Sequence, residues 1–156
     1  MIDRIKKLLS GAGWEEPSDD PKQDTQAAVA ALLVEAGRMD QDFSSDERRV
    51  VEDLLAQRFE LSKAQVSELI EAADKRTSQS AQYFPFTHRI NQAMGNEEKT
   101  EVIEMLWSVA YADGTLDPYE DQLIRQIAGL IYVTDRDRML ARKRALAKIA
   151  GTGEEN

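Results

Sequence analysis

Residues 25–39 read TQAAVAALLVEAGRM, and residues 101–112 read EVIEMLWSVAYA. Both stretches are apolar on nearly every side of a helical wheel, whereas a helix at a protein surface keeps one polar face. Helices of this kind lie in the middle of a bundle, so the two stretches are predicted to form its central pair. Gly37 and Ala110 are small enough to let the backbones of such helices approach closely.

The segments between and after this pair also carry helical signals. Ser44 with Glu47, and Ser62 with Gln65, have the spacing of a capping box, in which two side chains satisfy free N–H groups at a helix start. No segment shows sustained alternation of apolar and polar residues between turn signals, so no β-sheet is expected. The sequence therefore predicts an all-α fold.

The sequence aligns with itself when it is shifted by about 73 residues. The same unit then appears twice: an apolar helix, an acidic turn, a capped amphipathic helix, a second cap and another helix. Such repeats usually pack about a pseudo-twofold axis. We therefore expect a single helical bundle built from two pseudo-repeated units, with a core that includes Leu33, Leu54, Leu106, Val109, Leu123 and Ile127. In the first unit the matched residues are Leu33, Asp40, Phe43, Ser44, Glu47, Val50, Val51, Leu54 and Phe59. In the same order, their partners in the second unit are Leu106, Asp113, Leu116, Asp117, Glu120, Leu123, Ile124, Ile127 and Tyr132. After one deleted residue, Ser62 is matched with Thr134.

Four segments are expected along the chain. Residues 1–11 form a short amphipathic helix, because apolar and basic residues take opposite sides of it. Residues 12–24 combine two prolines with many acids and form a linker. Residues 25–150 form the helical domain, and residues 151–156 form a disordered tail.

Composition excludes several classes of function. The chain has 156 residues and no cysteine, which fits one domain without disulfides or thiolate metal sites and indicates a cytoplasmic protein. The net charge of -9 argues against nucleic-acid binding, because phosphates would be repelled, and favours a cation or a basic partner. Residues 136–148, however, carry six bases against one acid. This run either docks an acidic partner or complements the dipole of a C-terminal helix.

Two acidic turns, DQDFSSDE at 40–47 and DGTLDPYE at 113–120, are the candidate sites. In one interpretation they only shape helix starts: Asp117 caps a helix that begins at Pro118, and Leu116 packs into the core. In the other they collect hard oxygen ligands for Ca²⁺ or Mg²⁺. The spacing is not that of an EF-hand, so the expected site is a weak one. The candidate ligands are Asp113, Asp117 and Glu120 in one turn, and Asp40, Asp42 and Glu47 in the other.

Catalysis is not expected. The single histidine, His88, follows an aromatic run and is predicted to be a partly buried packing residue. Neither a glycine-rich phosphate loop nor a hydrolase motif occurs in the sequence. Trp107 and Tyr111 lie on a predicted central helix and are expected to fill the core, with Tyr111 bordering the acidic turn.

VAYADGTLDPYEDQLIRQIA at 109–128, together with EAGRMDQDFSSDERRVVEDLL at 35–55, resembles the TerB-like (tellurite-resistance protein B) family. The family's mark is a helix ending in A-x-A-D-G, a hydrophobic residue two positions on, and an acid near the start of the next helix. The resemblance covers roughly residues 25–150, although Asp42 replaces a small residue common in the family. It implies an all-helical bundle with an acidic, metal-responsive surface and association with a membrane partner. Related domains occur in DnaJ-like co-chaperones, but this chain lacks the His-Pro-Asp motif of a J-domain.

Two functions follow as hypotheses. One is a non-enzymatic accessory protein of stress or tellurite resistance that binds a divalent cation and works with another protein, such as a membrane protein of a resistance system. The alternative is an interaction module that binds a protein or a membrane surface without a metal. The amphipathic stretch 1–11 would anchor only weakly, because it buries little apolar surface.

Overall fold

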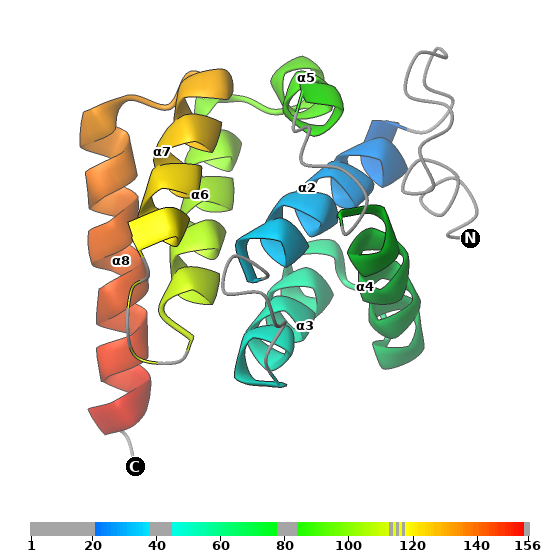
Figure 1. Ribbon diagram of the computed structural model, residues 1–156, viewed down its shortest axis with the longest axis horizontal. Coiled ribbons are helices and arrows are strands. Elements are labelled where there is room, and N and C mark those ends of the chain that lie inside the picture. The colour runs from blue at the N-terminus through cyan, green and yellow to red at the C-terminus, as the bar shows by residue number, and fades with distance from the viewer. Residues whose placement is uncertain are drawn as a thin grey trace.

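The computed structural model describes residues 21–37, 45–77, 84–112, 114, 116 and 118–154 (Figure 1). Within these ranges the regular structure is helical throughout, which confirms the predicted all-α bundle without a β-sheet. The helices, in chain order, are α2 (Pro21–Gly37), α3 (Ser45–Phe59), α4 (Lys63–Thr77), α5 (Phe84–Ala93), α6 (Asn96–Ala110), α7 (Pro118–Leu130) and α8 (Asp135–Glu154).

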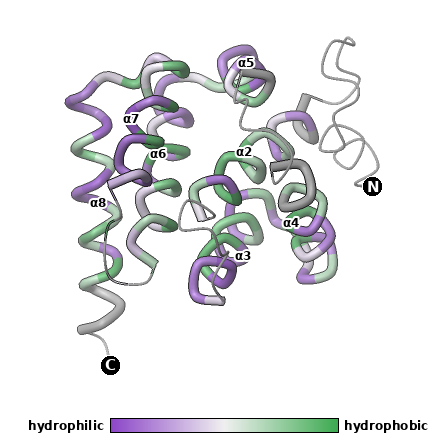
Figure 2. The backbone as a smooth tube through the Cα atoms, in the orientation of Figure 1, coloured by the Kyte–Doolittle hydropathy of each residue, from purple (hydrophilic) through white to green (hydrophobic). Residues whose placement is uncertain are grey.

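Helix α2 is the centre of the bundle. From Asp24 to Gly37 its side chains are buried on all sides, with Glu35 half-buried. It packs against α3, α4, α5, α6 and α7, and Figure 2 shows the hydrophobic residues along it. The many alanines between Ala27 and Ala36 permit this, because small side chains let neighbouring helices come close from every direction.

Helix α6 is the second central helix, as predicted, and packs against α2, α3, α7 and α8. Leu106 and Trp107 are buried in its middle. The other expected core residues Leu33, Val109, Leu123 and Ile127 are also buried. Leu54 is an exception: it is only partly buried, and its neighbour Leu55 lies in the core.

Two triples of helices have the same internal contacts. We call α2, α3 and α4 the N-terminal triple, and α6, α7 and α8 the C-terminal triple. Within each triple every helix packs against the other two. This is the arrangement that a structural repeat would produce, and the pseudo-twofold axis itself stays a prediction.

The turns that join α3 to α4 and α7 to α8 have the same backbone form. Glu60 and Tyr132 follow the helix ends with φ values of 54° and 62°, in the left-handed region that usually ends a helix at glycine. In each turn the next N–H group donates back to a helix carbonyl, from Leu61 to Ala56 at 3.3 Å and from Val133 to Ala128 at 2.9 Å.

Each turn is followed by a hydroxyl that caps the next helix. The predicted capping box at the start of α4 is confirmed: Gln65 N–H donates to Ser62 Oγ at 3.2 Å, and Ser62 N–H donates to Gln65 Oε1 at 3.0 Å. At the start of α8, Asp137 N–H donates to Thr134 Oγ1 at 3.1 Å. Ser62 and Thr134 are also the two residues that the predicted internal repeat matches with each other.

Helix α5 lies between the two triples and packs against α2 and α7. Pro85 falls in its first turn, where a proline is tolerated because its missing N–H would have no helical partner. Arg89 pairs with the buried carboxylate of Asp24 on α2 at 3.4 Å. Asn91 Nδ2 donates to the carbonyl of Leu130, the last residue of α7, at 3.0 Å.

The segment boundaries differ from those expected at both ends of the described chain. Helix α2 begins at Pro21, so the last residues of the stretch 12–24 are helical rather than linker. Helix α8 continues to Glu154, so most of the stretch 151–156 is helical rather than a disordered tail. The helix expected over residues 1–11 lies outside the described residues.

Candidate functional site

Two glutamates occupy matching positions at helix starts. Glu47 lies in the first turn of α3 and is 4% exposed, and Glu120 lies in the first turn of α7 and is 1% exposed. A helix N-terminus favours a carboxylate because its free N–H groups carry partial positive charge. Such deep burial is nevertheless unusual for a glutamate, because a buried charge is stable only with compensating partners.

The chain turns sharply between α6 and α7. Tyr111 N–H donates to the carbonyl of Trp107 at 3.0 Å and closes α6, and Gly114 N–H then donates to the carbonyl of Tyr111 at 3.0 Å. Gly114 has φ +91°, which L side chains rarely adopt. Leu116 is half-buried against the core, and α7 starts at Pro118, both as predicted.

Four of the six predicted metal ligands, Asp40, Asp42, Asp113 and Asp117, lie outside the described residues. The other two are Glu47 and Glu120. Among the side chains that the structure describes, no three histidine, aspartate or glutamate residues form a group suited to a metal ion. The six-residue ligand set therefore stays a prediction, and its described members are carboxylates held at two helix starts.

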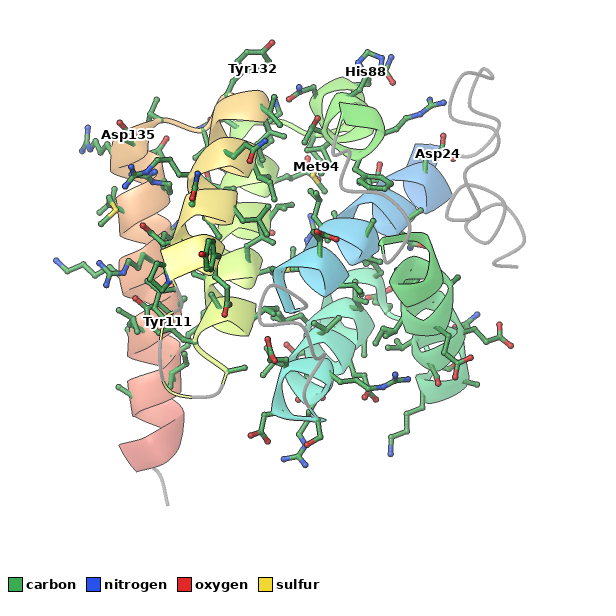
Figure 3. All side chains as sticks on the ribbon, viewed as in Figure 1. Asp24, His88, Met94, Tyr111, Tyr132 and Asp135 are labelled. Atoms are coloured by element: carbon green, nitrogen blue, oxygen red, sulfur yellow. The ribbon has the colours of Figure 1, made fainter. Side chains whose placement is uncertain are left out.

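An arginine on α8 holds the end of α6 next to the second acidic turn. The guanidinium of Arg142 lies 5.7 Å from the ring centre of Trp107 and 5.8 Å from that of Tyr111. Its Nε donates to the Tyr111 hydroxyl at 2.8 Å. Trp107 is buried, as expected, whereas Tyr111 is half-buried at the lower end of α6, close to the turn (Figure 3). Cation–π contacts of this kind strengthen when they are shielded from water.

A second charged cluster lies further up α6. Glu104 accepts hydrogen bonds from Arg144 Nε at 2.7 Å and from Lys148 Nζ. Burial raises the pKa of Glu104, but the hydrogen bonds and charges of Lys148 and Arg144 outweigh burial and hold the pKa below its ordinary value. Glu104 was not among the predicted site residues, although a carboxylate between the apolar residues of 102–107 was a signal that could have found it.

Glu104 borders a groove of about 800 Å³ between α3, α6 and α8. On the α3 side of the groove Arg58 pairs with Glu101 at 3.3 Å and with Glu98 at 3.4 Å. Both signs of charge therefore line the groove, and these acids and bases already pair with one another. This pattern does not select a cation or an anion as ligand.

The prediction for His88 is wrong. Its side chain is exposed on α5 and points away from the bundle (Figure 3), whereas Phe86 and Thr87 beside it are buried. The prediction failed because a ten-residue helix packs only one side, and His88 falls on the other.

Within the described ranges, no helix is both long enough and apolar enough to cross a lipid bilayer. Comparison with curated proteins gives no match, and comparison with solved structures gives none either. The family model for tellurite resistance protein TerB matches residues 26–143, which is most of the chain and includes both acidic turns. The chain therefore belongs to the TerB family.

Proposed function

We propose that this protein is a non-enzymatic accessory protein of tellurite or metal stress resistance, and that its two acidic helix starts bind a divalent cation. Membership of the TerB family supports the association with tellurite resistance. The cation would be Ca²⁺ or Mg²⁺, because the candidate ligands are carboxylate oxygens. In this role the protein acts by binding, and binding would adjust its surface for a partner protein.

The observation that carries the proposal is the burial of Glu47 and Glu120 at matching helix starts. Each is the last acid of its acidic turn and the buried one, so each would bind the cation from the side of the protein core. The outer ligands would be Asp40 and Asp42 in one turn, and Asp113 and Asp117 in the other. A cation between a buried inner carboxylate and the outer acids would neutralise charges that otherwise repel one another.

The test is calorimetry of the full chain with millimolar Ca²⁺ and with Mg²⁺, the range expected for a weak carboxylate site. Asp117→Asn would keep the helix cap predicted for Asp117, because asparagine caps a helix about as well as aspartate, but it removes a charged side chain from the proposed ligand set. We expect the substitution to leave the fold intact and to weaken cation binding. Glu120→Gln should weaken binding in the same way.

Asp135→Asn is the matched control, because Asp135 also stands in the first turn of a helix but lies on the exposed start of α8. Its cation affinity should equal that of the wild type. A wild-type protein that shows neither binding heat nor a cation-dependent shift of its melting temperature would exclude the metal site. The acidic turns would then serve only as helix starts.

A further inference from the structure

The outer face of α8 carries large hydrophobic side chains where a solvent-facing helix should be polar. Exposed large hydrophobic side chains gather on this helix: Met139, Leu140, Leu146 and Ile149. The exposed base Arg136 precedes them and the exposed base Lys143 lies between them, and Figure 2 shows hydrophilic and hydrophobic residues alternating along α8. We call these six residues the α8 face. Helix α8 itself lies at one edge of the bundle, beside α6 and α7 (Figure 1).

The α8 face forms a continuous stripe. Arg136, Met139, Lys143 and Leu146 follow one another at spacings of three and four residues, so they lie on the same side of the helix. With Ile149 the stripe is about 20 Å long, at 1.5 Å per residue. A shallow, largely apolar hollow of about 450 Å³ lies on this side of α8, lined by Arg136, Met139, Leu140, Arg142, Lys143 and Leu146. A contiguous apolar surface rimmed by charge is typical of a site that binds another molecule.

The matching helix of the N-terminal triple provides an internal comparison. The described side chains that α4 exposes are Lys63, Ala64, Glu68 and Glu71, a small residue and charges of both signs. None of its described side chains is a large exposed hydrophobic. Two helices in the same place in their triples thus differ on their outer faces, and the position in the fold does not account for the apolar residues of α8.

We propose that the α8 face binds an amphipathic helix of a partner protein, with apolar residues on one stripe and acidic residues beside it. A straight stripe with apolar side chains every three or four residues fits a second helix that packs alongside. Acidic residues of the partner would meet Arg136 and Lys143, which provides charge complementarity.

Two other occupants fit less well. An anionic membrane would attract Arg136 and Lys143 but would repel the molecule as a whole, whose net charge is -9. A symmetric dimer would place the α8 faces of two copies together, because a twofold interface uses the same patch on both. Lys143, near the middle of the stripe, would then meet Lys143 of the other copy.

The probe is a synthetic helical peptide of about 20 residues with a leucine stripe flanked by glutamates, added to the ¹⁵N-labelled full chain in EDTA. We expect amide shifts confined to α8, and affinity that falls as salt is added because the charges are exposed. Lys143→Glu should weaken binding about tenfold through like-charge repulsion. Leu146→Ser should weaken it by removing apolar contact. EDTA keeps the result independent of cation binding at the acidic turns.

Lys63→Glu on α4 is the matched control, since it makes the same change of charge on the corresponding helix and should leave the affinity unchanged. Amide spectra of all three variants establish that they are folded.

The proposal is overturned if the peptide does not bind, if it shifts the amide signals of residues away from α8, or if a peptide with lysines in place of glutamates binds equally well. Binding through α8 to phosphatidylcholine–phosphatidylglycerol vesicles but not to the peptide would assign the face to a membrane. Self-association that Lys143→Glu alters would assign it to a second copy.

Discussion

Helices α2 and α6 hold matching places in the two triples, but their surroundings differ. Ala28 of α2 is fully buried, while Glu101, its counterpart on α6, is 57% exposed along its side chain. Ala31 is likewise fully buried, while its counterpart Glu104 carries ion pairs with α8 at the edge of the groove. The difference shows that alanine stands where another helix comes close, and glutamate stands where the face borders solvent.

Helix α5 is a neighbour of α2 that has no counterpart among the helices that pack against α6. It packs against α2 and is fixed to α2 and α7 by Arg89 and Asn91. On α6 the corresponding flank faces the groove between α3 and α8. The small residues of α2 are therefore not shared by the matched positions of α6, and they accompany a neighbour that, of the two helices, only α2 has.

The strongest test of the comparison exchanges residues between the two helices. Ala31→Glu places a carboxylate where no water reaches it, and we expect a loss of more than about 4 kcal/mol in the free energy of unfolding. The reverse change, Glu104→Ala, should lose about 1 kcal/mol or less, because partly exposed ion pairs contribute little. Urea denaturation followed by circular dichroism measures both. A stable Ala31→Glu protein would show that α2 is not enclosed.

A second test compares two leucines that the repeat matches, Leu33 on α2 and Leu106 on α6, both fully buried. Each truncation to alanine leaves a cavity and should lower the free energy of unfolding by roughly 2 to 5 kcal/mol. The same denaturation measurement applies. If either change lowered stability by less than about 1 kcal/mol, that helix would not belong to the common core.

The caps that start α4 and α8 give a smaller effect. Ser62→Ala and Thr134→Ala each remove a hydroxyl that accepts a backbone N–H, and each should lower stability by about 0.5 to 2 kcal/mol. Ser62→Thr and Thr134→Ser are conservative controls that keep the acceptor and should be nearly silent. Thermal melts of the four variants would separate capping from packing. A silent Thr134→Ala would show that the two turns are alike in form but not in energy.

The smallest expected effect concerns pH. Because the pKa of Glu104 is held below its ordinary value in the folded state, its ion pairs stabilise the protein above the unfolded-state pKa of 4.5 and are lost as pH falls through the lower, folded-state pKa. Glu104→Gln should therefore flatten part of the acid limb of the stability curve. Matching acid limbs in Glu104→Gln and the wild type would show that the pairs with Arg144 and Lys148 do not contribute in solution.

Local patterns predicted most of the fold. The central helices, the capping box at Ser62 and the helix start at Pro118 depend on residues within a few positions of one another, so the sequence contains all the information they need. The repeat added the pairing of Ser62 with Thr134, two residues that both cap helices. Leu54 was misplaced because neighbouring leucines at 54 and 55 leave the phase of an amphipathic helix ambiguous.

The candidate site was less predictable, because it depends on contacts between distant segments. Glu47 and Glu120 were placed at helix starts by spacing, but their burial depends on the packing of several helices. The contacts of Arg142 with Trp107 and Tyr111, and those of Arg144 with Glu104, join residues on α6 to residues on α8. Periodicity cannot specify which of several arginines on α8 reaches which partner on α6.

The enclosure of α2 also bears on how the molecule opens. Five helices cover α2, so water can reach its backbone only when several of them separate together. We therefore expect the amide hydrogens of α2 to exchange with solvent only through cooperative unfolding of the whole bundle. The outer turns of α4 and α8 should exchange much sooner by fraying. Hydrogen exchange would thus reveal α2 as the last element to open, and hence as the rigid link between the two acidic helix starts.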